Sequence, residues 1–424
     1  MKVFKFGGAS VKDTASVKNI AVILGRYSGN LLVVVSAMGK TTNALERLLK
    51  AYLEGNKQLI ENEFRALYDY HMNMAIELIP DPQHILFTEL RNIFADIENK
   101  MEAPSGLPYN QEYDQLVSLG EIISTIIVSN YLNYRGIINQ WTDARQFLKT
   151  DSTFREGRVN WNLSDRLIKE QFDFRNTRLY VTQGFIGSAL NNQTTTLGRE
   201  GSDYTAAILA YILDAESVTV WKDVPGVLNA DPKWFDNTVC IDNMSYADAI
   251  ELAYYGASVI HPKTIQPLKN KGIRLFVKSF LHPEYDGTLI GNVRYEKLVP
   301  SFIFKMNQVL IHIQPDDFSF IAEDNLERIF RLFAGFGLKI NLMQNSAISF
   351  DVCVNNDEHV VPDVLLELNR EFKVKCTEWL ELITIRYYDE ETIERVIVNK
   401  ELILTQRTAK TVQMVVKDLG NMKI

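Results

Sequence analysis

Cysteine is scarce in this 424-residue chain. The three cysteines, Cys240, Cys353 and Cys376, are far apart and none belongs to a CxxC pair. This spacing provides neither a disulfide framework nor a zinc site, and it favours a reduced, cytoplasmic protein. The six histidines form no HExxH or other paired motif, so we expect no metal ion bound directly by the protein.

Long apolar runs and basic runs are missing as well. No apolar run approaches the ~20 residues that span a bilayer. The N-terminal MKVFKFGGAS leads directly into a strand, without the apolar segment and cleavage site of a signal peptide. Lysine and arginine number 45 against 53 acidic residues, a net charge of −8. This balance argues against a surface for nucleic acid or membrane.

Apolar residues make up 46% of the chain, enough at this length for two or three domains. Over residues 1–295, short apolar strands alternate with helical patterns, which predicts an α/β fold with an open, mainly parallel sheet and helices on both faces. Within it, 44–108 is helical and charge-rich and predicts a helical subdomain. Over 296–424 the order strand, helix, strand, strand, helix, strand is followed by an abbreviated repeat, which predicts ferredoxin-like α+β modules.

The most informative stretch is 181–213, VTQGFIGSALNNQTTTLGREGSDYTAAILAYIL. It predicts a buried strand, a polar loop and the start of a helix, which is where parallel α/β sheets form their sites. Gly198 and Gly201 would allow positive φ and a close approach of the backbone to a ligand.

Three polar residues stand at the start of the predicted helix. Ser202 and Asp203 would occupy the N-cap and the first turn. The free N–H groups there, together with Arg199, would attract an anion. The same pattern also fits a capped helix after a glycine loop, without any ligand.

A pair of glycines, Gly7 and Gly8, follows the first predicted strand, 2–6. Paired glycines at a strand-to-helix turn can form a nest of N–H groups that holds phosphate, and Lys5 could reach over it. A tight turn of no chemical interest is the alternative.

A second loop, SAMGKTTN, follows the apolar strand 31–35. Its GKT triplet suggests a Walker A loop, but Val34 stands where that motif requires glycine, so we reject this interpretation. The loop still offers the hydroxyls of Ser36 and Thr42. Farther along, Glu121 stands among apolar residues and is either a carboxylate facing a site or an ordinary surface charge.

Nine segments carry a family resemblance: KFGGAS, VVSAMGKTTN, SLGE, TQGFIG, TTTLGREGSDYTAA, WKDVPGV, DPK, GASVIHPKT and GTLI. In this order they resemble the aspartokinases of the amino acid kinase superfamily. The resemblance covers essentially the whole chain, because the C-terminal modules resemble the tandem ACT domains of these enzymes. It implies transfer of the ATP γ-phosphoryl group to the β-carboxylate of L-aspartate, giving 4-phospho-L-aspartate, the first step toward lysine, threonine and methionine. Mg²⁺ would arrive with ATP.

The resemblance assigns roles to sets of residues. The catalytic set would comprise Lys5, Gly7, Gly8 and Asp203. The substrate-binding set would comprise Ser36, Thr42, Glu121, Arg199 and Ser202. The nucleotide-binding set would comprise Lys5, Gly7, Gly8, Lys222, Asp223, Leu228, Lys233 and Ser258. An effector would contact Asn341, Gln344, Asn345 and Ser346.

The resemblance also implies a specific role for each charged residue in binding and catalysis. Lys5 would neutralise the migrating phosphoryl group, and Asp203 would orient Lys5. Arg199 would bind the α-carboxylate of aspartate, and Glu121 would accept a hydrogen bond from its α-ammonium. Thr42 would help to place the substrate.

Some positions depart from the family pattern. Ser258 stands where many relatives have a lysine near the ATP phosphates, Leu228 where a tyrosine is common, and Lys233 where arginine is frequent. Either Lys222 or Lys263 would then have to supply the missing cation.

The C-terminal modules suggest assembly and feedback control. In lysine-inhibited relatives, carboxylates tend to occupy the places of Asn341 and Ala347, so we expect lysine to inhibit weakly or not at all and threonine to be the likelier effector. We also expect a homodimer, or a dimer of dimers, through this region, with an apolar edge such as 348–354 as the pairing surface.

Two other interpretations remain open. A different amino acid kinase, such as a glutamate or acetylglutamate kinase, should lack SLGE and the paired ACT modules. A catalytically silent ACT-type sensing protein would have lost Lys5, Arg199 or Asp203, and all three are present.

Overall fold

Strands of nearly continuous apolar sequence build the central sheet of the N-terminal part. In the computed structural model, all five residues of β2 (Leu31–Val35) are buried, as expected for a parallel strand covered on both faces. The structure describes residues 1–104, 106–235, 237–257, 260–293, 295, 298–317 and 319–420.

The chain divides into two compact units, each described here by itself. The first comprises Met1–Val227, Cys240–Ile250 and Val259–Arg294. The second comprises Leu228–Val239, Glu251–Ser258 and Tyr295–Ile424. Two segments that precede residue 296 in the sequence therefore pack with the C-terminal modules.

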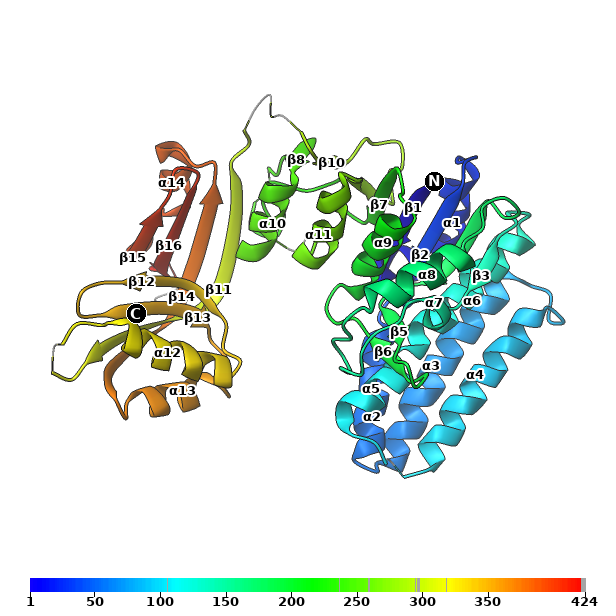
Figure 1. The fold of residues 1–424 in the computed structure, drawn as a ribbon, viewed down its shortest axis with the longest axis horizontal. Helices are drawn as coiled ribbons and strands as arrows, with labels where there is room; N and C mark the ends of the chain where they lie inside the picture. Colours follow the sequence, from blue (N-terminus) through cyan, green and yellow to red (C-terminus); the bar gives the residue numbers. More distant parts are fainter. Residues whose placement is uncertain are drawn as a thin grey trace. The chain divides into compact units, whose positions relative to one another are not determined.

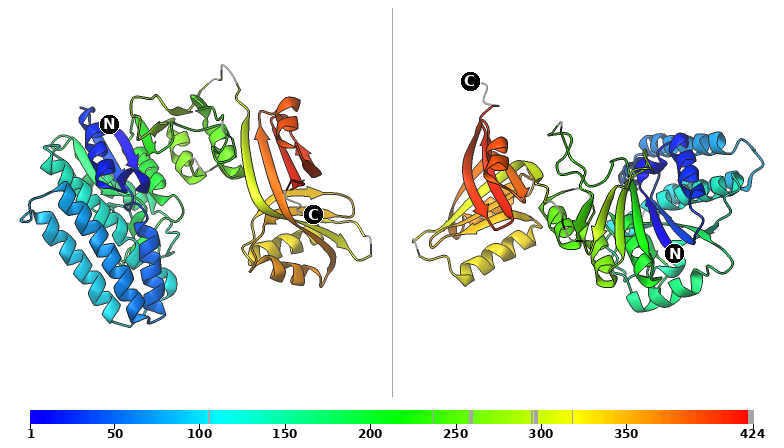
Figure 2. Two further views of the ribbon diagram at one scale, coloured as in Figure 1. Left: turned by 180° about the vertical axis from the view of Figure 1, so that it is seen from behind. Right: turned by 90° about the horizontal axis from the view of Figure 1, so that it is seen from above.

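The first unit is built on an eight-stranded sheet in the order β3-β4-β2-β1-β7-β9-β10-β8. Besides β2, its strands are β1 (Lys2–Phe6), β3 (Gln140–Thr142), β4 (Leu179–Gln183), β7 (Ser217–Lys222), β8 (Asn243–Ser245), β9 (Arg274–Ser279) and β10 (Thr288–Gly291). Neighbouring strands are parallel except for the β9–β10 pair. Helices cover both faces of the sheet (Figures 1 and 2), so the predicted fold class is confirmed.

The helices of this unit fall between the strands of the sheet. They are α1 (Thr14–Gly25), α2 (Thr41–Leu53), α3 (Lys57–Leu78), α4 (Ile85–Glu102), α5 (Tyr109–Val117), α6 (Leu119–Tyr134), α7 (Ala144–Phe147), α8 (Trp161–Gln171), α9 (Gly201–Ile212) and α11 (Pro262–Lys271). A further helix, α10 (Tyr246–Tyr255), begins in this unit, and its residues from Glu251 onward belong to the second unit. A short hairpin of β5 (Ile186–Ser188) and β6 (Thr194–Thr196) lies between β4 and α9, where the sequence predicted only a polar loop. The apolar sequence also predicts strands at 137–141 and 257–261. The first is present as β3, which begins at Gln140, and the described residues of 257–261 form no strand.

The long helices α2, α3 and α4 lie together beyond one end of the sheet (Figure 1). His71 of α3 is fully buried, and burial lowers its pKa to about 4. Its ring nitrogen lies 3.2 Å from the hydroxyl of Thr41 at the start of α2.

Among the described residues, one helical stretch, Tyr109–Tyr134, is long and apolar enough to cross a membrane, and 78% of its apolar window is buried inside the fold.

The second unit contains one six-stranded sheet in the order β12-β13-β11-β14-β16-β15. Its elements are β11 (Ser301–Pro315), α12 (Glu323–Gly335), β12 (Ile340–Asn345), β13 (Phe350–Asn355), α13 (Val361–Leu368), β14 (Phe372–Arg386), α14 (Glu390–Val396), β15 (Lys400–Arg407) and β16 (Thr411–Asp418). The sequence pattern predicts two separate strands here, a short one around 374 and a second at 380–388, whereas the structure has one long strand, β14. Like β11, it carries a residue with positive φ where the register shifts: Trp379 (φ 61°) in β14 and Asn307 (φ 51°) in β11.

The expected pairing edge at 348–354 is wrong. It corresponds to β13, which is hydrogen-bonded to β11 on one side and to β12 on the other. The edges of this sheet are β12 and β15.

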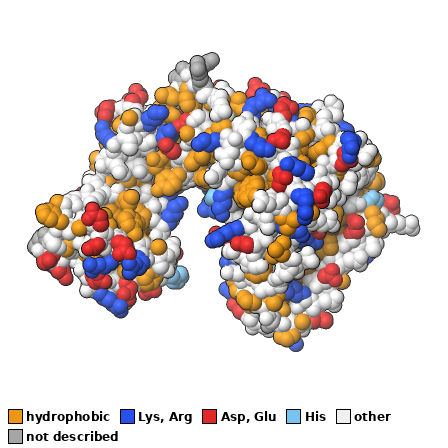
Figure 3. Space-filling model, viewed as in Figure 1, with side chains coloured by type: hydrophobic (Ala, Val, Ile, Leu, Met, Phe, Trp, Pro, Cys, Tyr) orange, Lys and Arg blue, Asp and Glu red, His pale blue; other side chains and the backbone are white. Residues whose placement is uncertain are grey.

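On the face of the protein shown in Figure 3, basic and acidic side chains are interspersed.

Candidate active site

A cavity of about 960 Å³ lies in the first unit, where β1, β2, β4 and β7 end. Parallel strands bring their carboxyl ends to one edge of a sheet, so the loops that follow them can share one ligand. The cavity is lined by most of the residues predicted as catalytic or substrate-binding: Lys5, Gly8, Ser36, Thr42, Glu121, Arg199, Ser202 and Asp203.

Lys5 and Asp203 form an ion pair in the lining of this cavity. Lys5 Nζ lies 2.6 Å from Asp203 Oδ1, and both side chains are buried. Lys5 is held in the middle strand β1 and Asp203 in the first turn of α9. The ammonium is therefore fixed in position before any ligand arrives.

The loops after β1 and β2 pack tightly against each other. The amide of Gly39 donates to the carbonyl of Gly8. A Cβ atom at Gly8 would lie 3.0 Å from the carbonyl oxygens of both Ala37 and Gly39. Gly7 is adjacent, and a Cβ there would lie 3.4 Å from Lys5 Nζ.

The start of α9 differs from the prediction. Its N-cap is Glu200, in the left-handed region at φ 54°, and Ser202 and Asp203 are the second and third residues of the helix. The predicted positive φ is present at Gly198 (φ 78°), whereas Gly201 is required for space, because a Cβ there would lie 2.7 Å from the ring of Phe185.

Glu121, whose position the sequence left undecided, faces the cavity. It is 3% exposed, and its Oε1 accepts from the amide of Ala37 at 3.3 Å. Its Oε2 is buried without a hydrogen-bond partner among the described residues. Burial raises the pKa of Glu121 to about 8. Because an unsatisfied buried carboxylate is costly, this group holds a proton at neutral pH when no cation lies beside it. A ligand cation next to it would favour the ionised form.

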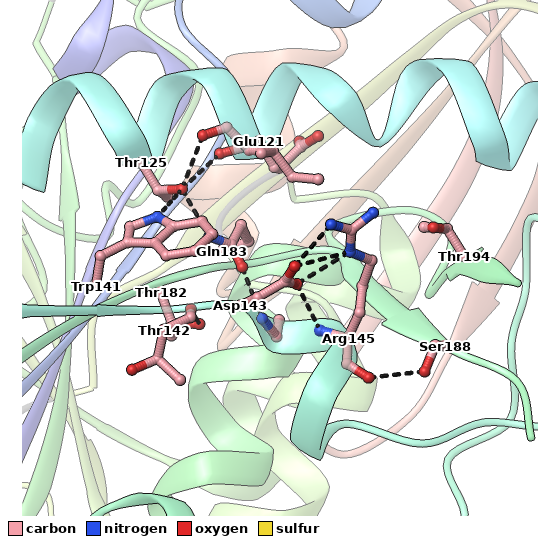
Figure 4. Close-up of polar contacts among 12 residues, drawn as sticks. Glu121, Thr125, Trp141, Thr142, Asp143, Arg145, Thr182, Gln183, Ser188 and Thr194 are labelled. Atoms are coloured by element: carbon pink, nitrogen blue, oxygen red, sulfur yellow. Dashed lines mark hydrogen bonds and ion pairs between the residues drawn. The ribbon is translucent and has the colours of Figure 1, made fainter. Parts of the chain in front are cut away.

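A hydrogen-bond network holds the helix that carries Glu121 (Figure 4). The hydroxyl of Thr125, one turn farther along α6, donates to the carbonyl of Glu121. It accepts from Trp141 Nε1 at 2.9 Å and from Gln183 Nε2 at 2.7 Å. Gln183 Oε1 in turn accepts from the amide of Ala144. The network therefore fixes α6 against the ends of β3 and β4.

The residues expected around the nucleotide are only partly in this cavity. Lys222, at the end of β7, lines it, whereas Asp223 is not among the lining residues. Leu228 and Lys233 belong to the second unit, and Ser258 lies outside the described residues.

Lys263 lines a different cavity. This cavity, of about 560 Å³, lies between α8, α9 and α11 and is also lined by Trp161, Tyr204 and Tyr211. Of the two lysines considered as replacements for the missing cation, Lys222 is therefore the one in the first cavity.

The sequence did not single out one side of the first cavity. The loop before α8 contributes Arg155, and α5 contributes Tyr113, a neighbour of the fully buried Asp114. Asp114 accepts from the amide of Arg155 and from the amide and hydroxyl of Thr196. These residues lie far apart in the chain and follow no known motif, so no local signal marked them.

The expected effector residues lie in the second unit. Gln344, Asn345 and Ser346 are exposed at the end of the edge strand β12. Asn341 is buried. Its amide group donates to Gln308 and Asn355, each at 2.8 Å.

The fold and the cavity define an α/β enzyme of the amino acid kinase type. The model of the amino acid kinase family matches residues 1–279. Lysine-sensitive aspartokinase 3 of Escherichia coli (strain K12) is 31% identical over 400 residues, which cover 90% of this chain and 86% of that protein. The chain belongs to the aspartokinases, the ATP-dependent members of this family that act on aspartate.

Two further comparisons agree. The crystal structure of E. coli aspartokinase III in complex with aspartate and ADP superposes with a TM-score of 0.83 at 28% identity, covering 98% of this chain and 96% of that chain. The chloroplastic aspartokinase 1 of Arabidopsis thaliana is 30% identical over 371 residues, and the chain spans 63% of its length.

Proposed function

We infer that this chain transfers the γ-phosphoryl group of ATP to the β-carboxylate of L-aspartate. The observation that carries the inference is one cavity that combines the buried Lys5–Asp203 pair, the unsatisfied carboxylate of Glu121 and the guanidinium of Arg199. Lys5 and Arg199 offer positive charge and Glu121 offers an acceptor, while Asp203 is paired with Lys5. This set suits a substrate with two carboxylates and one ammonium, next to a phosphate chain.

The reaction demands little acid–base chemistry. The β-carboxylate is ionised at neutral pH and attacks without a general base. A new O–P bond forms while the bond from the γ-phosphorus to the bridging oxygen breaks, and ADP leaves with the electron pair. The protein must overcome the repulsion between two anions and align them.

Each side chain of the cavity has a role in this proposal. Lys5 stabilises the negative charge of the migrating phosphoryl group, and Asp203 holds Lys5 in place. Arg199 binds the α-carboxylate of aspartate, and Glu121 accepts from its α-ammonium. Ser36 donates to the phosphoryl group from the loop after β2.

Other predicted residues complete the proposed contacts. Thr42 and Ser202 hold the substrate from the first turns of α2 and α9, and Gly7 and Gly8 leave room for the phosphates. Lys222 is the proposed cation at the nucleotide end of the cavity.

Mg²⁺ is proposed to enter bound to ATP. Among the described residues no group of three histidine, cysteine or acidic side chains is placed to hold a metal ion, and Mg²⁺ commonly binds through substrate phosphates with one or two carboxylates. Asp203 is the carboxylate proposed to contact it. When bound, the ion would neutralise charge on the phosphate oxygens.

A single assay tests the reaction. The purified protein is incubated with MgATP and, separately, with L-aspartate, L-glutamate or N-acetylglutamate, and acyl phosphate is trapped with hydroxylamine. We expect hydroxamate from aspartate. Hydroxamate from glutamate or acetylglutamate instead would establish a different amino acid kinase, and none at all would leave the sensing role as the better explanation.

We further propose that the protein is a cytoplasmic homodimer whose contact lies in the second unit. β12 and β15 are the edge strands of this sheet, and an edge strand is a surface that a two-fold partner can cover. Light scattering at micromolar concentration should give twice the chain mass, and a monomer there would rule the dimer out.

A further inference from the structure

Arg155 occupies a backbone conformation that an arginine does not favour. It lies in the left-handed region at φ 69°, where a side chain costs energy that glycine avoids. Residues held in this way tend to be placed by their surroundings at functional sites. Arg155 lines the same cavity as Lys5, Glu121 and Arg199.

Buried contacts hold the backbone of Arg155. Its amide donates to Asp114 Oδ2 at 2.9 Å, and Asp114 is fully buried. The same carboxylate accepts from the amide and the hydroxyl of Thr196 in β6. The next amide but one, that of Gly157, donates to the carbonyl of Thr196 at 2.8 Å. The loop is therefore tied to the hairpin that leads to α9.

The guanidinium of Arg155 is supported by aromatic rings. It lies 4.4 Å from the ring centre of Tyr113 and 5.7 Å from that of Tyr109. Tyr113 is itself fixed, because its hydroxyl donates to Glu46 at 2.8 Å. Among the described residues, no carboxylate oxygen lies within 4.0 Å of the Arg155 guanidinium. An arginine stacked on aromatic rings keeps its hydrogen-bond donors available for an anion.

The neighbours of Arg155 indicate which anion it meets. A Cβ atom at Gly198 would lie 3.1 Å from the carbonyl oxygen of Arg155, so the loop is packed against the residue that precedes Arg199. The residues proposed for the phosphate, Lys5 and Gly8, belong instead to β1 and the loop that follows it. Arg155 therefore stands on the acceptor side of the cavity.

We propose that Arg155 is a second acceptor-binding residue, which hydrogen-bonds the α-carboxylate of the substrate together with Arg199. The proposal rests on the proposed function and deepens it, because it adds a determinant of acceptor affinity. The α-carboxylate does not react. Loss of Arg155 should therefore raise the KM for aspartate and change kcat little.

Replacement by glycine separates binding from folding. Arg155→Gly removes the guanidinium and relieves the left-handed backbone, so its melting temperature should stay within about 2 °C of the original. We expect its KM for aspartate to rise about 10-fold, the scale of one charge-assisted hydrogen bond, with the KM for ATP nearly unchanged. The KM of Arg155→Lys for aspartate should lie between that of the original protein and that of Arg155→Gly. Arg158→Ala is the matched control, since Arg158 is exposed in the same loop but does not line the cavity.

A change in the ligand identifies the group that Arg155 contacts. Calorimetry should compare L-aspartate with L-aspartic acid α-amide, which keeps the β-carboxylate but lacks the α-carboxylate. We expect Arg155→Gly to weaken aspartate about 10-fold and the α-amide less than about 2-fold. Equal weakening of both ligands, equal weakening of ATP, or no weakening at all would overturn the proposal.

The control for the proposed function is the unmodified protein. If it yields no hydroxamate from aspartate, the proposed function fails and this inference fails with it. If it is active and Arg155→Gly binds aspartate normally, only the role of Arg155 is refuted.

Discussion

Lys5 Nζ lies 2.6 Å from Asp203 Oδ1, and the side chains are only 10% and 4% exposed. Removing one partner of a buried ion pair leaves the other uncompensated. In this protein the pair joins the middle strand of the sheet to the first turn of α9, so it sets the distance between the proposed phosphate site and the proposed acceptor site.

Lys5→Met should lower turnover by about 10²- to 10³-fold, because the charge that stabilises the migrating phosphoryl group is lost, worth roughly 3–4 kcal/mol. Steady-state kinetics with MgATP and aspartate measure the effect. Lys2→Met is the matched control in the same strand. Lys2 is more exposed and pairs with Glu216 at 3.7 Å, a surface contact worth little. Near-normal turnover of Lys5→Met would reduce Lys5 to a structural charge.

Much of the fold could be predicted from sequence, because periodicity and glycine positions are local signals. The strand–loop–helix at 181–213 and the glycine loop after β1 are examples. Burial of Glu121 is not a local property: it depends on how α6 packs among other elements, so the sequence left its position open. Arg155 is harder still, because Asp114, which holds its backbone, is 41 residues away.

Glu121→Gln should change how stability depends on pH. The pKa of Glu121 is raised to about 8 from 4.5, so between these values the folded protein binds a proton that the unfolded chain releases. The stability of the unmodified protein should therefore fall as pH rises through this window, by up to about 1.4 kcal/mol per pH unit. Glutamine carries no such charge.

The measurement is urea unfolding from pH 5.5 to 8.5. The stability of Glu121→Gln relative to the unmodified protein should increase with pH and level off above about pH 8. Glu98→Gln, on the exposed side of α4, should show no such trend. Parallel curves for Glu121→Gln and the unmodified protein would mean that Glu121 does not titrate in this range.

Gly184→Ala should disturb α9 by crowding. A Cβ atom at Gly184 would lie 2.4 Å from Ser202 Cβ and 2.6 Å from Ser202 Cα. Because the close atoms include backbone, the start of α9 must move, at a cost of about 1–3 kcal/mol. We expect turnover to fall about 10-fold or more, since displaced catalytic groups lose alignment.

Gly25→Ala is the control for this substitution. A Cβ atom there meets nothing within 4 Å, and Gly25 does not have positive φ. Its thermal unfolding should match or slightly exceed that of the unmodified protein. If Gly184→Ala is equally harmless in melting temperature and turnover, then the contact between the β4 loop and α9 does not hold the site.

The surroundings of Lys305 in the second unit predict how the protein responds to lysine as an effector. Lys305 Nζ donates to Asn341 Oδ1 at 2.8 Å, and both amide hydrogens of Asn341 are used by Gln308 and Asn355. Burial lowers the pKa of Lys305, and nearby Lys339 lowers it further. An effector with a side-chain ammonium would meet a satisfied amide and another amine instead of a carboxylate.

We therefore expect millimolar lysine to inhibit this protein weakly or not at all, and threonine, which has no side-chain ammonium, to be the likelier effector. Initial rates and calorimetry on the full-length protein with each amino acid measure this. Lys305→Gln removes the charge beside Asn341 and keeps a polar side chain, so it should increase any sensitivity to lysine. Half-inhibition of the unmodified protein by micromolar lysine would contradict the prediction, because loss of each charge-assisted bond should cost about 10-fold in affinity.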